Sequence, residues 1–202
     1  AARRGCRTYL AVAGGFTAEP VLGSRSTYLP GAIGGHQGRA LRAGDVLPVG
    51  AADGERYPAL KRSLAADTPG FSAARWFMAS PEDLHASAPL RVTAGRHWKL
   101  FSADSRQSFL GPEFRIGVQS NRMGYRLEGP RIVPMRPADL LSEAISFGTV
   151  QVPPDGQPIV LMADRQTTGG YPKIAEVTGA DLPRLAQRCT WCSRPRRACS
   201  AR

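Results

Sequence analysis

The stretch "GTVQVPPDGQPIVLMA", residues 148–163, decides the fold class of this 202-residue chain. Two runs rich in β-branched and aliphatic residues flank the tetrapeptide Pro153-Pro154-Asp155-Gly156. The prolines fix φ, the Asp side chain can bond its own backbone, and the Gly tolerates a positive φ, so this tetrapeptide is typical of a turn. The segment therefore predicts a β-hairpin, and its second strand leads the chain directly into residues 163–175.

Short strand patterns surround this hairpin. "YLAVA", "LRVTAG" and "FRIGVQSNRMGYRLEGP" predict strands within residues 9–13, 90–95 and 114–130, and "GRALRAGDVLPV" predicts a strand pair at 38–49. "ADLLSEAIS" at 138–146 and Ser80-Pro81-Glu82-Asp83 predict short helical turns. The 22 Gly and 17 Pro residues favour short strands joined by turns, and the sequence shows neither Rossmann-type alternation nor a P-loop. The predicted fold class is mainly β.

The net charge of +11 does not predict a nucleic-acid partner. Much of the excess lies at the ends of the chain, in Arg3, Arg4 and Arg7 and in five arginines after residue 187, and the middle is only mildly basic. No RNA- or DNA-binding motif accompanies these charges. No apolar run approaches the roughly 20 residues that span a bilayer, so no membrane partner is predicted either.

Three of the four cysteines, Cys189, Cys192 and Cys199, lie in the last segment, "RCTWCSRPRRACSAR". Structural zinc usually takes two close pairs of ligands, whereas this segment has one C-x2-C pair and no nearby His, so no metal site is predicted. The composition changes abruptly after Gln187, as it does when GC-rich DNA is read out of frame. We interpret residues 188–202 as a tail outside the fold. A one-base shift of the coding DNA that restores an apolar strand would support this hypothesis.

Candidate chemistry lies in three polar corners, which are residues 23–39, residues 119–125 and "ADRQTTGGYPKIA" at 163–175. Each combines a cation with amide or hydroxyl groups and a nearby glycine. Arg binds a carboxylate through two hydrogen bonds, and carboxamides pair with the N–H and C=O of an amide. A Gly-Gly pair lets backbone N–H groups form an anion nest. This combination suits a small planar substrate with amide and carboxylate character.

Simpler interpretations stand beside this one. Arg25 fits a surface charge, Asn121 fits a turn residue that bonds its own backbone, and Arg122 and Arg126 fit solvent-facing positions on a sheet. The third corner also fits a long hairpin loop. Its many potentially functional side chains nevertheless favour a binding role there, because binding groups concentrate on loops held by a rigid scaffold.

Four blocks together resemble the carboxyltransferase-domain family, also called allophanate hydrolase subunit 2. They are "YLAVAGGF", "VLGSRSTYLPGAIGGHQGRALRAGD", "QSNRMGYRLEGP" and "GTVQVPPDGQPIVLMADRQTTGGYPKIAEVTGADLPRLAQ". The resemblance implies two cyclophilin-like β-barrel domains, of which the first is incomplete at its N-terminus, so that the chain is a fragment. Its implied segments are a first domain at 1–50, a linker at 51–88, a second domain at 89–187 and a non-family tail at 188–202.

The resemblance also implies a site that handles an N–C=O group. Arg165 and Lys173 are the implied catalytic charge clamp, and Asp164 is the implied base. The implied substrate-binding residues are Gln166, Tyr171, Gly169, Gly170, Asn121, Arg122, Tyr125 and Arg25.

The activity implied by the resemblance is that of one part of a multi-subunit enzyme, most simply the C subunit of an ATP-dependent 5-oxoprolinase. Its implied partners are a protein of the allophanate hydrolase subunit 1 type and an A-type oxoprolinase subunit, in the cytoplasm. No cofactor is expected to bind directly, since ATP would act through a partner. Two alternatives stay open. One is the carboxyltransferase domain of urea carboxylase (urea amidolyase), with carboxybiotin as a substrate. The other is a non-catalytic regulatory module that binds a kinase-inhibitor-type partner subunit.

Overall fold

A computed structural model describes residues 6–7, 9–52, 54, 58–59, 62, 88–136 and 140–188. The chain divides into two compact units, one formed by residues 1–8 and 80–202 and the other by residues 9–79. The helical turn predicted at Ser80 and the cysteines of the C-terminal tail lie outside the described residues.

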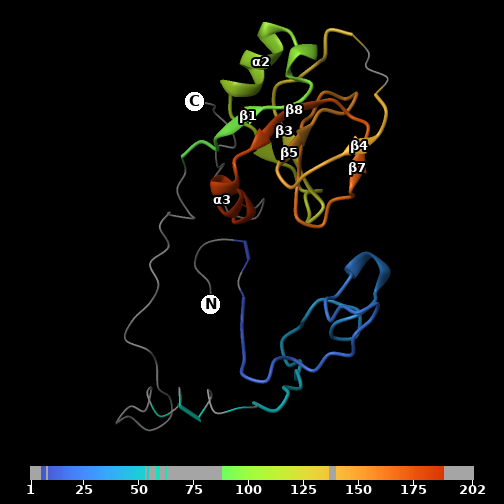
Figure 1. The fold of residues 1–202 in the computed structure, drawn as a ribbon, viewed down its shortest axis with the longest axis vertical. Coiled ribbons are helices and arrows are strands. Elements are labelled where there is room, and N and C mark those ends of the chain that lie inside the picture. The colour runs from blue at the N-terminus through green and yellow to red at the C-terminus, as the bar shows by residue number, and fades with distance from the viewer. Residues whose placement is uncertain are drawn as a thin grey trace. The chain divides into compact units, whose positions relative to one another are not determined.

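An antiparallel sheet of six strands forms the centre of the first unit, in the order β1-β8-β5-β6-β3-β2 (Figure 1). The strands are β1 (Val92–Ala94), β2 (Arg115–Ile116), β3 (Gly124–Glu128), β5 (Thr149–Gln151), β6 (Ile159–Leu161) and β8 (Lys173–Val177). A separate two-stranded sheet pairs β4 (Glu143–Ala144) with β7 (Thr168–Gly169). The helices of this unit are η2 (Trp98–Leu100), α2 (Ala103–Leu110), η3 (Gly179–Asp181) and α3 (Leu182–Ala186). In Figure 1, α2 lies above the sheet and α3 below it.

The predicted hairpin is confirmed as β5 and β6, which pair in register at Val150 and Val160. The turn residues adopt the conformations that their types predict. Gly156 has a φ of +77°, and Asp155 Oδ1 accepts a hydrogen bond from the backbone N–H of Gln157 at 2.9 Å. A side-chain oxygen and a left-handed glycine together reverse the chain without strain.

The core lies on one face of the sheet. Tyr125, Val160, Val150 and Ala175 are paired across four adjacent strands, so their side chains share that face, and each is at most 3% exposed. Helix α2 adds Phe109, whose ring lies 6.1 Å from that of Phe114 between centroids. The opposite face of the same strands is therefore available for polar side chains.

The strands predicted in residues 90–95 and 114–130 are confirmed as β1, β2 and β3. The helical turn predicted at 138–146 is wrong in its described part, because Glu143–Ala144 is strand β4 paired with β7. Helix α2 was not predicted. It begins after Ser102, whose hydroxyl accepts a hydrogen bond from Ser105 N–H, which is a typical N-cap.

The second unit contains η1 (Leu29–Gly31) and isolated bridges such as Phe16 with Val49. The predicted strand at 9–13 and the predicted strand pair at 38–49 do not form, although Asp45 closes the expected turn by binding the backbone N–H of Arg42 and the guanidinium of Arg39. All buried hydrophobic side chains of the described chain belong to the first unit. In that unit, β1 and β2 end the sheet order without pairing to each other. Two closed barrels are therefore not confirmed.

Across the described ranges, no helix has both the length and the apolar character that crossing a membrane requires.

Candidate functional site

A polar cavity of about 330 Å³ lies on the face of the sheet opposite the core. Its polar lining residues are Gln119, Asn121, Arg126, Gln151, Gln166 and Tyr171. Met123, Gly124, Ile159 and Leu161 provide the apolar part of the wall. Three residues predicted from the sequence, Asn121, Gln166 and Tyr171, are thus brought together from two corners that lie about forty residues apart in the chain.

Strand register places two further polar groups in the cavity. Ile159 of β6 pairs with Arg126 of β3 on one side and with Gln151 of β5 on the other. Residues directly opposite each other in a sheet point to the same face, so Arg126 and Gln151 both lie on the cavity face. No ion pair links Arg126 to a carboxylate of the described residues, which leaves its positive charge available for an anionic ligand.

Asn121 shapes the rim of the cavity. Its Oδ1 accepts hydrogen bonds from the backbone N–H groups of Met123 at 2.8 Å and Gly124 at 3.3 Å. This is the self-capping turn that the simpler interpretation of Asn121 predicts. Because the oxygen is engaged, only the NH2 end of this side chain is available to a ligand.

An ion pair joins the second corner to the third. Arg122 Nε lies 2.8 Å from Asp164 Oδ2, and Arg122 Nη2 donates to Asp164 Oδ1 at 3.0 Å. The backbone N–H of Asp164 also donates to the carbonyl of Arg122. Both side chains are largely exposed, so the pair aligns the two corners more than it stabilises the fold. The predicted role of Asp164 as a base stays a prediction, and its carboxylate is engaged by Arg122 in this structure.

Lys173 is buried, with 4% of its surface exposed, and its charge is matched inside the protein. Its Nζ lies 2.8 Å from Glu143 Oε1 and donates to the carbonyl of Gly169 at 3.3 Å. The hydrogen bond from Lys173 lowers the pKa of Glu143. The structure therefore gives Lys173 an internal partner, whereas the predicted charge clamp needs an ammonium group that faces a ligand.

His97 and Arg96 complete this charge cluster. Arg96 Nη1 lies 3.1 Å and His97 Nε2 lies 3.6 Å from the Glu143 carboxylate. Burial lowers the pKa of His97, and its Nδ1 accepts a hydrogen bond from the backbone N–H of Lys173 at 3.2 Å. The cluster ties β4 and β8 to the segment that follows β1.

Arg165 is half-buried and does not line the polar cavity. Its Nε donates to the carbonyl of Ile145 at 3.4 Å, and its Nη1 to that of Ala163 at 3.5 Å. These contacts are long and involve no carboxylate, so the guanidinium is held weakly. The predicted catalytic role of Arg165 stays a prediction.

The Gly169-Gly170 pair has a packing role that the sequence did not indicate. Neither residue has a positive φ, so the pair does not have the alternating conformation of an anion nest. A Cβ on Gly169 would lie 2.5 Å from Gln151 Nε2, and a Cβ on Gly170 would lie 3.2 Å from the carbonyl oxygen of Leu140. Gly169 makes room for the Gln151 side chain.

Two predicted substrate-binding residues are not brought to the cavity. Tyr125 lies on the core face at 3% exposure, and its hydroxyl donates to the carbonyl of Ala186 at 3.3 Å and accepts from Arg7 Nη1 at 2.7 Å. Arg25 belongs to the second unit, where its Nε donates to the carbonyl of Ala18 at 3.1 Å.

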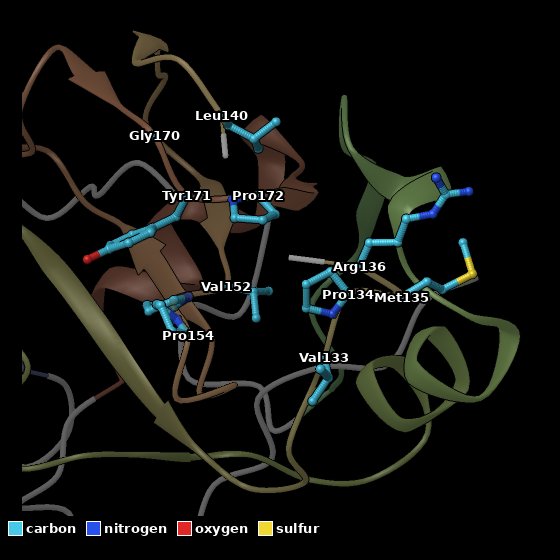
Figure 2. Close-up of a pocket in the computed structure, with 11 residues that line it drawn as sticks. Val133, Pro134, Met135, Arg136, Leu140, Val152, Pro154, Gly170, Tyr171 and Pro172 are labelled. Carbon is cyan, nitrogen blue, oxygen red and sulfur yellow. The ribbon is translucent and has the colours of Figure 1, made fainter. Parts of the chain in front are cut away.

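Tyr171 also lines a second, apolar groove of about 840 Å³, shown in Figure 2. Val133, Pro134 and Met135 form one wall, and Val152, Pro154 and Pro172 lie opposite. The tyrosine hydroxyl points away from the Pro134 wall (Figure 2). Tyr171 is therefore a lining residue of both the apolar groove and the polar cavity.

Among the described residues, no three His, Cys, Asp or Glu side chains gather where they could hold a metal ion.

Comparisons with known proteins agree with this architecture. Residues 1–190 match the family described as "Carboxyltransferase domain, subdomain A and B". The chain is 41% identical over 185 residues to the C subunit of 5-oxoprolinase from Escherichia coli K12, and the match covers 92% of this chain and 54% of that protein. It is 30% identical over 197 residues to the urea amidolyase of Lachancea kluyveri, covering 91% of this chain and 10% of that protein.

A solved structure shows the same similarity. The crystal structure of the K. lactis urea amidolyase superposes with a TM-score of 0.68 at 27% identity, covering 98% of this chain and 12% of that one. The chain thus spans about half the length of the E. coli relative and a small part of the L. kluyveri and K. lactis urea amidolyases. A family match over most of the chain, together with this shared fold, shows that the chain belongs to the carboxyltransferase-domain family, through its subdomains A and B.

Proposed function

We propose that this chain is part of the C subunit of an ATP-dependent 5-oxoprolinase and helps to bind a small cyclic amide. The observation that carries the proposal is the polar cavity, where carboxamide groups converge with an arginine that has no carboxylate partner among the described residues. The 41% identity to the C subunit of the E. coli 5-oxoprolinase supports it. Relatives that are named as subunits imply partner subunits. We propose that these are of the allophanate hydrolase subunit 1 type and of the A type of oxoprolinase subunits.

The chemistry of the cavity suits 5-oxoproline, which carries a lactam and a carboxylate. Carboxamides such as those of Gln166 and Gln151 match the donor and acceptor of a lactam edge. Arg126 offers the cation that a substrate carboxylate needs. Urea shares the N–C=O group and lacks the carboxylate, so Arg126 favours the lactam acid over urea.

In this proposal the chain binds and orients the substrate, and a partner protein couples the reaction to ATP. Binding the ring with its amide edge against fixed carboxamides would hold the carbonyl in one orientation for attack, which lowers the entropic part of the barrier. The ATP that drives the reaction is available in the cytoplasm, and we propose that the complex works there.

The second candidate is the carboxyltransferase step of urea carboxylase, in which a carboxyl group passes from carboxybiotin to urea. The identity to the L. kluyveri urea amidolyase and the superposition on the K. lactis enzyme favour it. The same carboxamides would bind urea. A third candidate is a regulatory module without its own substrate. It predicts that neither 5-oxoproline nor urea with bicarbonate stimulates ATP hydrolysis.

The test measures ATP hydrolysis by the complete complex of this protein with its partner subunits. We expect 5-oxoproline to stimulate hydrolysis, and urea with bicarbonate to have little effect. Arg126→Met should raise KM for 5-oxoproline about tenfold or more, because it removes the charged hydrogen bonds to the carboxylate. Arg115→Met is the matched control, since Arg115 pairs with Glu128 and does not line the cavity. Stimulation by urea with bicarbonate but not by 5-oxoproline would favour the second candidate, and stimulation by neither would contradict both enzymatic proposals.

A further inference from the structure

Gln151 is the most unusual polar residue of the site. It lies on β5, between β6 and β8 in the middle of the main sheet, and only 2% of its surface is exposed. Its Nε2 finds no hydrogen-bond partner among the described residues. The side chain nevertheless lines the polar cavity.

A buried carboxamide without a partner works against folding. Leaving a buried donor unsatisfied costs free energy, and native proteins satisfy nearly all such groups. Its chain neighbours Val150 and Val152 are apolar and fully buried on the core face, and on its own face Gln151 lies opposite the apolar Ile159 and the buried Lys173. An apolar residue at position 151 would fit the same strand without the penalty, so the carboxamide requires another explanation.

The surroundings of Gln151 are built to accommodate the carboxamide. Gly169 of β7 has no side chain at the point where a Cβ would stand 2.5 Å from Gln151 Nε2. Cross-strand neighbours also restrict the side chain, since Ile159 lies opposite it on β6 and its backbone is fixed on both edges of β5. A carboxamide held in this way binds a ligand with less loss of side-chain entropy than the exposed carboxamides of Gln119 and Gln166 at the rim.

We infer that the Gln151 carboxamide is the specificity-determining contact of the polar cavity, which pairs with the N–C=O edge of a small amide ligand. This inference rests on the proposed function and names the group that selects its substrate class. Rotation of the carboxamide by a half turn exchanges its donor and acceptor, so the residue can match either end of the amide edge. A ring of the same size without the amide leaves the buried carboxamide unpaired, and the site rejects it.

Ligand discrimination by the complete complex tests the inference. The dissociation constants of 5-oxoproline and of cyclopentanecarboxylate, which keeps the ring and the carboxylate but lacks the amide, are measured by calorimetry. We expect the wild-type protein to favour 5-oxoproline at least tenfold. Gln151→Met keeps the length of the side chain and should bring the ratio near one by weakening 5-oxoproline alone. Its melting temperature should stay equal or rise, because an unsatisfied buried group is removed.

A second variant guards against a folding defect in the first. Gly169→Ala should displace the carboxamide and reduce the same ratio, and Gly179→Ala is its control because a Cβ there meets no atom within 4 Å. The inference is overturned if the wild-type protein binds 5-oxoproline without discriminating it from cyclopentanecarboxylate, or if Gln151→Met keeps the wild-type ratio. Where Gln151→Met does not fold, an unchanged ratio in Gly169→Ala overturns it. If 5-oxoproline fails to stimulate ATP hydrolysis but 2-pyrrolidinone or urea binds in a manner that depends on Gln151, the proposed function falls and the inference stands. If 5-oxoproline stimulates ATP hydrolysis and Gln151→Met keeps the wild-type ratio of dissociation constants, the proposed function stands and the inference about Gln151 falls.

Discussion

At the scale of single residues, a charged side chain that forms an ion pair within the protein differs from one that does not. The first kind holds the site together, and the second kind is available to a ligand. Asp164 and Lys173, both predicted to be catalytic, have partners within the protein, in Arg122 and Glu143. Arg126, which the sequence indicated only as a solvent-facing residue, lines the polar cavity without a carboxylate partner among the described residues. A charge that must serve a substrate is more useful when the protein has not already neutralised it.

The buried position of Lys173 leads to a prediction about stability. Lys173→Met should lower the free energy of unfolding by about 1–3 kcal/mol, because it leaves Glu143 with the exposed Arg96 and with His97 as its remaining partners. Denaturant unfolding of Lys173→Met, Glu143→Met and the double variant measures this effect. The two single losses should together exceed the loss in the double variant, with a coupling energy of about 1 kcal/mol or more. If Lys173→Met removes activity with unchanged stability, Lys173 is the catalytic clamp that the sequence predicted.

The sequence predicted the loop residues of the site better than its strand residues. Gln166, Asn121 and Tyr171 stand out because polar side chains concentrate in connections between apolar runs. Gln151 sits inside the run "TVQV", where a polar residue at one position is ordinary for a strand with one solvated face. Two observations distinguish it, namely its register with Ile159 and an Nε2 that has no hydrogen-bond partner in the described part of the chain. Neither can be read from one sequence. Tyr125 lies on the core face for a related reason, since a shift of one residue moves a side chain to the other face, and its predicted role in binding stays a prediction.

At the scale of elements, local turn chemistry decided which predictions succeeded. The turn residues Pro153 to Gly156 specify the β5–β6 hairpin locally, and it forms as predicted. Strand β4 has no such signal, because Glu143 and Ala144 suit a helix and become strand only by pairing with Thr168 and Gly169. Helix α2 was missed although Ser102 caps it, because its weak amphipathic pattern buries only Phe109.

A close backbone contact between β1 and β8 gives the prediction for this scale. Gly95 follows β1, and its N–H donates to the carbonyl of Ile174 at 2.8 Å. A Cβ on Gly95 would lie 2.6 Å from the Lys173 carbonyl oxygen and 2.7 Å from Ala175 N, and these backbone atoms cannot rotate away. Gly95→Ala should therefore destabilise the protein by about 1–3 kcal/mol and speed amide exchange in β1 and β8. Gly179→Ala should do neither, and equal behaviour of the two variants would contradict the proposed contact.

At the scale of the whole molecule, the two units differ in the size of their hydrophobic cores and in the extent of their strand pairing. The first unit buries aromatic and aliphatic side chains from α2, from the sheet and from α3 in one core. In the second unit Tyr9 is 90% exposed and Leu22 is fully exposed, and the described residues make bridges but no extended strands. Strand propensity in "YLAVA" could not predict this outcome, because an extended run becomes a strand only when a neighbour pairs with it.

The acid stability of the molecule should depend on Asp181, which fastens the start of the sheet to α3. Asp181 is fully buried, accepts hydrogen bonds from Arg91 N–H at 2.6 Å and Arg91 Nη2 at 2.8 Å, and accepts another from Arg184 Nη1 at 3.1 Å. These bonds, chiefly those from the Arg91 side chain, lower the pKa of Asp181 to about 2. A carboxyl with a lowered folded-state pKa stabilises the protein above its unfolded pKa of about 4, by about 2 kcal/mol here, and loses this contribution as the pH falls towards 2. Thermal unfolding of Asp181→Asn should therefore show a large deficit against the wild-type protein at pH 7 that narrows between pH 4 and pH 2. Asp104→Asn, at an exposed position of α2, is the control, and a deficit for Asp181→Asn that stays constant over this range would show that the Asp181 charge does not hold the unit together.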